Sequence, residues 1–170
     1  MHKLHFCQSS LLRIGNGPGL YSVGSYSDFR ELCHRLKYGD RLTILEAASI
    51  ISSELAFPED SILVPMPSHL GYATDMISLA ECISHMTGIP FLDALQGNSR
   101  HSVYDAKKHG QILTAEELGF RLKADIPDGL RPLILDNVIA TGLTAYAALD
   151  VIPDASVIAL AIDTDKFVSR

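Results

Sequence analysis

The chain has 170 residues, of which 47% are hydrophobic and 20% charged, enough for a single globular domain with its own core. Its formal net charge of −6 argues against direct nucleic-acid binding, which normally needs a concentrated basic face. No apolar run is long enough to cross a bilayer and no secretory signal begins the chain, so we expect a soluble, cytoplasmic protein without a membrane partner. Its three cysteines lack Cys-x-x-Cys spacing, which indicates reduced thiols and no structural zinc.

The N-terminal part of the chain predicts a β-hairpin. Two runs of β-type residues, at 4–14 and 20–26, flank a cluster of glycines with one proline at 15–19, which is a turn signal. A nucleotide-binding glycine loop is the alternative, but the glycine spacing does not match the dinucleotide fingerprint. We therefore expect the turn.

Two helices are predicted next. Asp28 and Glu31 have the spacing of a capping box and begin an apolar helical pattern that ends near Gly39. A second helix is predicted over 42–55. Lys37 lies between the two helices and is interpreted as a solvated charge at a helix end.

A buried strand over 61–64 runs into the loop Pro65-Met66-Pro67-Ser68-His69. Two prolines so close together prevent a central strand from continuing and impose a stiff, extended loop. Backbone N–H groups in such a loop, with the side chains of Ser68 and His69, could hold an anion. An ordinary strand-to-helix connection is the alternative.

A helix over 74–87 and a short strand at 89–92 come before a long polar segment. Hydrophobic periodicity is lost between about 96 and 114, and long polar loops inside compact domains are often lids or binding loops. A solvated surface loop is the alternative. The cations of this segment that we single out are Arg100, Lys107 and Lys108.

The segment 133–144 combines a strand, an acid, a turn and a helix start. Its apolar beginning predicts a buried strand with Asp136 at the carboxyl end, where open α/β sheets bind ligands. The turn Thr141-Gly142-Leu143-Thr144 then opens a helix, whose first N–H groups and positive dipole favour a phosphate. Gly142 lets the backbone close around such a group, and the threonine hydroxyls can donate to it. The predicted ligand is a sugar phosphate. A last buried strand is expected over 155–162.

The same segment resembles the phosphoribosyl-pyrophosphate signature of type I phosphoribosyltransferases, in which a hydrophobic strand, two acids and two small aliphatic residues precede a Thr-Thr-Gly-x-Thr-like loop. Asn137 stands where the second acid usually is, and Ala140 where the first loop hydroxyl or a catalytic acid would be. The stretches around Lys37, at 65–69 and at 88–90 are similar to those of ComF-type phosphoribosyltransferases.

This resemblance implies an α/β domain over 1–170, with a mainly parallel twisted sheet flanked by helices and an N-terminal hairpin and helical segment. It implies binding of phosphoribosyl pyrophosphate and Mg²⁺, and transfer of the phosphoribosyl group to a nucleobase or amine with release of pyrophosphate. The implied catalytic residues are Asp136, Asn137, Lys107 and Lys108; the 5′-phosphate residues are Ala140, Thr141, Gly142, Leu143 and Thr144; the pyrophosphate residues are Pro65, Met66, Pro67, Ser68, His69 and Lys37. Asp136 would hold the magnesium indirectly, through water.

Two other functions stay open at this stage. A non-catalytic regulatory module that binds phosphoribosyl pyrophosphate or a nucleotide is favoured by Asn137 and Ala140. A ComF-like accessory role in DNA uptake rests on the resemblance alone. The sequence also leaves a homodimer open.

Overall fold

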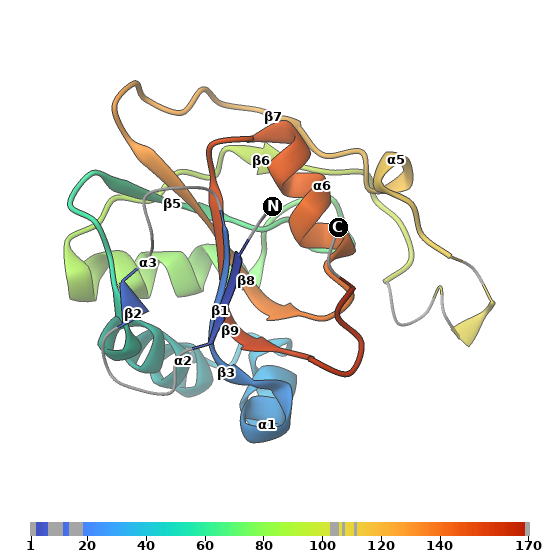
Figure 1. Cartoon of the computed structure of the whole chain (residues 1–170), viewed down its shortest axis with the longest axis horizontal. Coiled ribbons are helices and arrows are strands. Elements are labelled where there is room, and N and C mark those ends of the chain that lie inside the picture. The colour runs from blue at the N-terminus through green and yellow to red at the C-terminus, as the bar shows by residue number, and fades with distance from the viewer. Residues whose placement is uncertain are drawn as a thin grey trace.

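The computed structural model describes residues 3–6, 12–13, 19–102, 106, 108–110 and 112–168. A five-stranded sheet in the order β1-β3-β9-β8-β5 forms its centre, and every pairing within this sheet is parallel (Figure 1). The strands are β1 (Lys3–Phe6), β3 (Gly19–Ser25), β5 (Ser61–Pro65), β8 (Arg131–Ile139) and β9 (Ser156–Ile162). The predicted α/β class with a mainly parallel sheet is confirmed.

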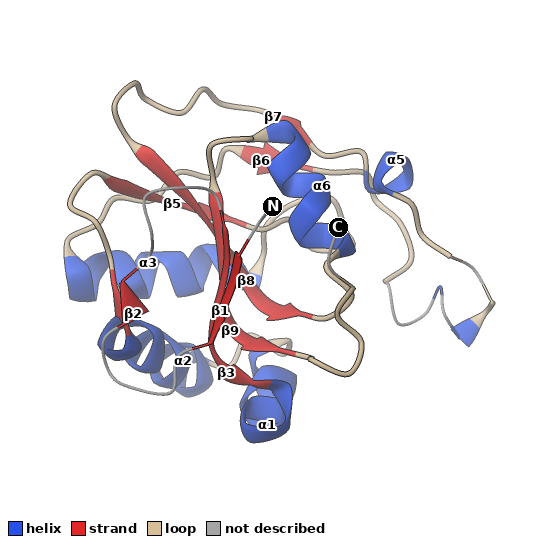
Figure 2. Cartoon of the chain, viewed as in Figure 1, coloured by secondary structure: helices blue, strands red, loops and turns tan. Residues whose placement is uncertain are grey.

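Helices cover both faces of this sheet (Figure 2). The helices α1 (Tyr26–Leu36), α2 (Arg41–Glu54) and α3 (Asp75–Thr87) pack on one face, and α6 (Leu143–Val151) packs on the other. A short helix, α5 (Ala115–Leu118), lies outside these layers. Within the described residues, every helix is too short or too polar to cross a membrane.

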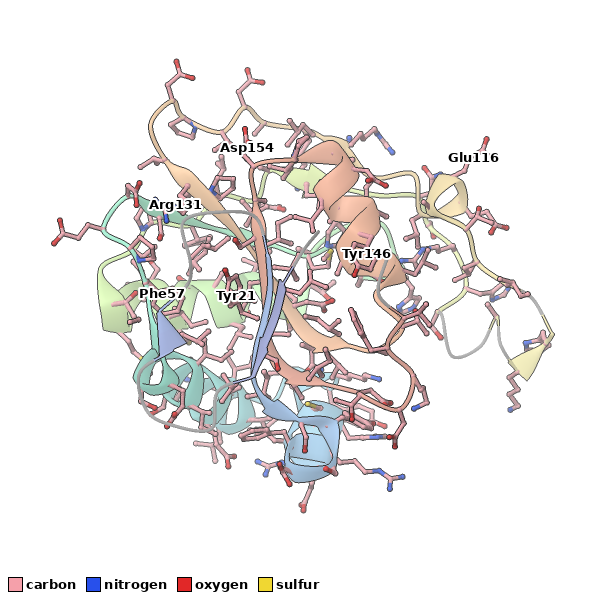
Figure 3. All side chains as sticks on the ribbon, viewed as in Figure 1. Tyr21, Phe57, Glu116, Arg131, Tyr146 and Asp154 are labelled. Atoms are coloured by element: carbon pink, nitrogen blue, oxygen red, sulfur yellow. The ribbon has the colours of Figure 1, made fainter. Side chains whose placement is uncertain are left out.

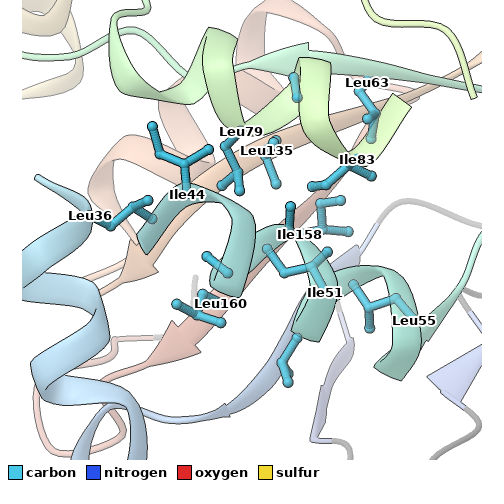
Figure 4. Packing of buried hydrophobic residues seen from close by; sticks show 14 of the residues in the cluster. Leu36, Ile44, Ile51, Leu55, Leu63, Leu79, Ile83, Leu135, Ile158 and Leu160 are labelled. Atoms are coloured by element: carbon cyan, nitrogen blue, oxygen red, sulfur yellow. The ribbon is translucent and has the colours of Figure 1, made fainter. Parts of the chain in front are cut away.

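The two faces of the sheet carry two hydrophobic clusters. Leu135 and Ile158 point into the cluster beneath α1, α2 and α3 (Figure 4), whereas Ile134 and Val157 point into the cluster beneath α6. Successive side chains of a strand point to opposite faces, so the uninterrupted apolar runs of β8 and β9 supply both clusters. The central strands are therefore buried on both sides.

Two minor sheets lie outside the main one. The strand β2 (Leu12–Arg13) pairs in parallel with β4 (Leu55–Ala56), and β6 (Leu95–Gln96) pairs antiparallel with β7 (Arg121–Leu122). The short strand expected at 89–92 is reduced to one bridge, between Phe91 and Leu63.

The predicted N-terminal hairpin is wrong. β1 and β3 are parallel neighbours, so no tight turn can connect them. Between them the chain forms β2, which pairs with β4 instead, and β3 has the parallel strand β9 on its other side. The non-local partners of these strands decided the topology. Most of the glycine-rich segment, 14–18, lies outside the described residues.

Two further boundaries differ from expectation. The helix α1 is capped by Ser25, whose hydroxyl accepts from the Asp28 N–H at 3.3 Å, so Asp28 is a first-turn residue rather than the cap. The strand β8 does not end at Asp136, because β9 stays apolar for long enough to pair with Val138 and Ile139 as well. By contrast, α2, α3, β5 and β9 begin and end within about one residue of the predicted bounds.

Candidate functional site

The carboxyl ends of β5, β8 and β9 lie at one edge of the sheet. Pro65, the last residue of β5, pairs with Leu135, while Ile139, the last residue of β8, pairs with Ile162 of β9. β8 therefore extends past β5 at this edge, where parallel α/β sheets bind ligands. The loops that follow β5 and β8 are the two that the sequence singles out, and the structure brings them to the same end of the sheet.

The loop after β8 forms an open turn at the start of α6. Gly142 precedes the helix with φ of 84° and supplies no side-chain cap to it, while the Leu143 N–H donates to the Thr141 hydroxyl at 3.4 Å. A Cβ at Gly142 would lie 2.9 Å from the ring of Tyr146 (Figure 3) and 3.0 Å from that of Phe167. The first N–H groups of α6 thus follow a turn in which only glycine fits closely. A helix start of this kind, with free N–H groups, can accept a phosphate.

Asp136 lies three residues before the end of β8 and is partly exposed. Its Oδ1 accepts a hydrogen bond from the Asn137 N–H at 2.7 Å. Burial raises the pKa of Asp136 from 3.8 to about 6, against the opposing effects of the Asn137 N–H and the charge of Lys37. A carboxylate acceptor therefore stands just before the phosphate-sized turn, with a lysine within electrostatic reach.

Asn137 has a different environment. Its side chain turns toward α1, where Nδ2 donates to the Cys33 carbonyl at 2.9 Å, and the residue is only 8% exposed. Its Oδ1 is buried and has no hydrogen-bond partner within the described residues. The amide nitrogen is thus already used inside the protein, although the sequence had grouped Asn137 with Asp136.

In the loop after β5, several backbone N–H groups already donate hydrogen bonds within the protein. Met66 is buried, and its N–H continues the sheet by donating to the Leu135 carbonyl at 2.9 Å. The Ser68 N–H donates to the Tyr72 carbonyl at 3.0 Å, which closes a turn. Pro65 and Pro67, which have no N–H, are buried as well, as the burial pattern of this stretch shows. The exposed imidazole of His69 remains available to an anion.

The polar segment that begins near residue 96 is joined to this loop. The Gly97 N–H donates to the Gly71 carbonyl at 2.8 Å, and the Arg100 N–H donates to the His69 carbonyl at 2.9 Å. Gly71 has φ of 90°, and a Cβ there would lie 2.6 Å from the Gly97 oxygen. The half-buried Arg100 has a buried Nε without a partner among the described residues, and burial lowers its pKa. Arg100 is therefore brought beside the predicted pyrophosphate loop.

The other two cations of the polar segment differ from Arg100. Lys107 lies outside the described residues, and Lys108 is exposed. The short stretch 108–110 projects from the body of the molecule at the right of Figure 1.

Two charged residues at this edge were missed by the sequence reasoning. Asp163, directly after β9, is buried, donates its N–H to the Ile139 carbonyl at 2.9 Å and binds the Lys166 ammonium with its carboxylate. Lys166 in turn lies 5.8 Å from the centre of the Tyr26 ring. The signal that could have found Asp163 is an acid directly after a buried strand, the same pattern that singled out Asp136.

Asp136 is the residue at this edge that would hold magnesium, and its chemistry fits an indirect, water-mediated contact. Within the described chain, no group of three or more His, Cys, Asp or Glu side chains could hold a metal ion. Asp136 offers a carboxylate just before the turn at Gly142, whereas the carboxylate of Asp163 at the same edge is paired with Lys166. Mg²⁺ is commonly held by one or two carboxylates together with substrate phosphates and water. The residues therefore fit an ion that arrives with its ligand.

The chain matches no protein-family model, and a search of curated proteins finds no match either.

Proposed function

We propose that this protein binds phosphoribosyl pyrophosphate at the carboxyl end of β8 and transfers its phosphoribosyl group to a nitrogen acceptor. One observation supports this most directly: the strand with Asp136 leads through the left-handed Gly142 into the uncapped start of α6. A carboxylate for ribose hydroxyls and a backbone cradle for the 5′-phosphate thus occur on one continuous segment.

The reaction would need little covalent chemistry from the protein. The nitrogen acceptor attacks the anomeric carbon, the bond from that carbon to the pyrophosphate oxygen breaks, and the bonding electrons leave with pyrophosphate. Thr141, Gly142 and Thr144 would hold the 5′-phosphate, while Asp136 would orient the ribose through its hydroxyls. Lys37, His69 and Arg100 are the groups that would neutralise charge on the departing pyrophosphate.

Asp136 would hold a magnesium ion indirectly, through water, and the ion would supply further neutralisation of the charge on pyrophosphate. The proton that the acceptor nitrogen loses would pass to solvent water, and no side chain at this edge is assigned as a general base, because a basic amine or nucleobase nitrogen is already nucleophilic.

A non-catalytic module that binds the same ligand is the second candidate. It is favoured by the orientation of Asn137, whose amide is used by α1 and which leaves Asp136 as the single acid of the signature. The two candidates share the binding site and differ in turnover.

Calorimetric titration of phosphoribosyl pyrophosphate, with and without Mg²⁺, tests the binding site. We expect magnesium-dependent binding to the wild type and weaker binding to Asp136→Ala. Asp154→Ala is the matched control, because Asp154 is exposed and lies before the amino end of β9 (Figure 3). A folded wild type that binds no phosphoribosyl pyrophosphate would contradict the proposal.

Release of pyrophosphate in the presence of a panel of nucleobases and amines then separates the two candidates. Turnover with any acceptor identifies a transferase. Tight binding without turnover across the panel identifies the regulatory module.

A further inference from the structure

The end of α1 is completed by a residue from the middle of the sheet. The last four carbonyls of a helix have no intrahelical partner and need another donor. Three of those in α1 accept from the following turn, in i+3 bonds of 3.0–3.2 Å: His34 from Lys37, Arg35 from Tyr38, and Leu36 from Gly39. The fourth, that of Cys33, accepts from Nδ2 of Asn137, which is 104 positions away in sequence.

This arrangement accounts for an amide at position 137. The Cys33 carbonyl is the remaining acceptor, and Cys33 is fully buried, so no solvent replaces a lost donor. An aspartate at position 137 would have the shape of asparagine but no N–H, and its carboxylate would face a carbonyl oxygen. The backbone of Asn137 is thus part of β8, while its side chain completes the end of α1.

The turn that Asn137 completes carries Lys37. Lys37 directly follows α1, and its N–H donates to the His34 carbonyl, one residue after the Cys33 carbonyl that Asn137 caps, so this turn is held against the strand of Asp136. The charge of Lys37 also acts on Asp136 and Cys33. A helix carries partial negative charge at its C-terminus, which would repel an anion at this edge, and a cation there offsets that charge. The position of Lys37 depends on how the last turn of α1 is held.

We propose that Asn137 is a positioning residue, which caps α1 so that Lys37 stands beside Asp136 and receives the pyrophosphate part of the ligand. This inference rests on the proposed function for its ligand, but the cap itself does not. Lys37 and Asp136 are then the two charged groups that meet the ligand, and the neutral Asn137 on β8 holds the helix end that carries the lysine.

Inorganic pyrophosphate is the probe, titrated calorimetrically into the wild type, Lys37→Met, Asn137→Ala and the double variant. We expect each single substitution to weaken binding about tenfold or more, as for loss of one hydrogen bond to a charged group. The double variant should bind no more weakly than Lys37→Met, because Asn137 acts through Lys37. Two independent effects that add would overturn the proposal, and so would wild-type affinity in the exposed-residue variant Lys37→Met.

Two further variants separate positioning from stability. Thr87→Ala removes another side-chain bond to a helix-end carbonyl, that of the Thr87 hydroxyl to Ile83 at 2.7 Å, and should lower the unfolding midpoint without changing pyrophosphate affinity. Asn137→Asp should behave like Asn137→Ala. Stronger magnesium-dependent binding by Asn137→Asp would mean that this side chain contacts the ligand directly, which would overturn the proposal.

Hydrogen exchange of the amides of Lys37, Tyr38 and Gly39 tests the cap without any ligand. We expect faster exchange of these amides in Asn137→Ala and unchanged exchange in Lys37→Met. Unchanged exchange in Asn137→Ala would show that Asn137 does not stabilise the end of α1. A wild type with a protected turn that binds neither pyrophosphate nor phosphoribosyl pyrophosphate would refute the proposed function and the role of Lys37, while the cap itself would stand.

Discussion

Asp136 is held where its own negative charge is unfavourable. The pKa of its carboxyl is about 6 in the folded protein, against 3.8 for the ordinary side chain, so the folded state binds the proton more tightly than the unfolded state. The stabilisation by this proton is complete below about pH 4 and is lost as the pH rises through about 6. Carboxyls with strongly perturbed pKa values cluster at functional sites, which supports the role proposed for Asp136.

Asp136→Asn should remove this pH dependence. Relative to the wild type, we expect the free energy of unfolding of the variant to rise by roughly 2–3 kcal/mol between pH 4 and pH 7, because only the wild type has to bury the charge. Urea unfolding at both pH values measures the difference. Asp154→Asn, at an exposed position, is the control and should show no such rise. If the free energies of unfolding of Asp136→Asn and the wild type differ by the same amount at both pH values, burial does not raise the pKa of Asp136.

Gly142→Val should abolish phosphate binding. An L-residue at φ of 84° is strained by about 1–2 kcal/mol, and its Cβ would also collide with the rings of Tyr146 and Phe167. Gly88→Val is the control, because Gly88 has φ of 77° but no atom within 4 Å of its would-be Cβ, and it lies at the end of α3. Both variants should lose stability, but only Gly142→Val should lose affinity for phosphoribosyl pyrophosphate; retained affinity would show that the turn does not hold the phosphate.

At the scale of elements, the joint between the loop after β5 and the segment 97–100 depends on a close backbone approach. Gly71→Ala would place a Cβ 2.6 Å from the Gly97 oxygen and break the fit that brings Arg100 to His69. We expect weaker pyrophosphate binding together with a loss of about 1–3 kcal/mol of stability. Calorimetry and urea unfolding measure the two effects.

Gly129→Ala is the control for Gly71→Ala, because it introduces similar backbone strain at a glycine away from this joint and without a close contact. Gly129 has φ of 80° but open space around its would-be Cβ, in the turn before β8. It should lose stability through backbone strain and keep the affinity of the wild type. If Gly71→Ala binds pyrophosphate as well as Gly129→Ala does, the joint has no part in binding.

Element boundaries were predictable where the signals are local. Asp40 caps α2 by accepting from the N–H groups of Leu42 and Thr43, and Gly88 ends α3 in the left-handed conformation. Each of these boundaries depends on residues that are close together in the sequence. Strand pairing has no such local signal. The glycine cluster before β3 suggested a hairpin, but pairing with β9 and the diversion of β2 to β4 made β1 and β3 parallel.

At the scale of the whole molecule, the five-stranded sheet contributes side chains to two hydrophobic clusters, one on each face. Ile134 and Leu135 are neighbours on β8, both fully buried, and they point into clusters on opposite faces. Ile134→Ala and Leu135→Ala should each lower the free energy of unfolding by about 2–5 kcal/mol. Because the same strand supports both clusters, unfolding followed by tyrosine fluorescence and by circular dichroism should give coincident transitions in each variant. Separate transitions would show that the two faces unfold independently.

The sequence by itself determined the α/β class, the helices with local caps, and the order of strand, acid, glycine turn and helix from β8 to α6, since each of these depends on residues close together in the chain. Only the tertiary structure decided what the Asn137 side chain and the Arg100 backbone contact, because their partners, the carbonyls of Cys33 and His69, lie far away in the chain and are brought close by the folded sheet. Asn137 shows the reason most clearly: its neighbour in sequence is an acid, but its hydrogen-bond partner is a helix carbonyl 104 positions away.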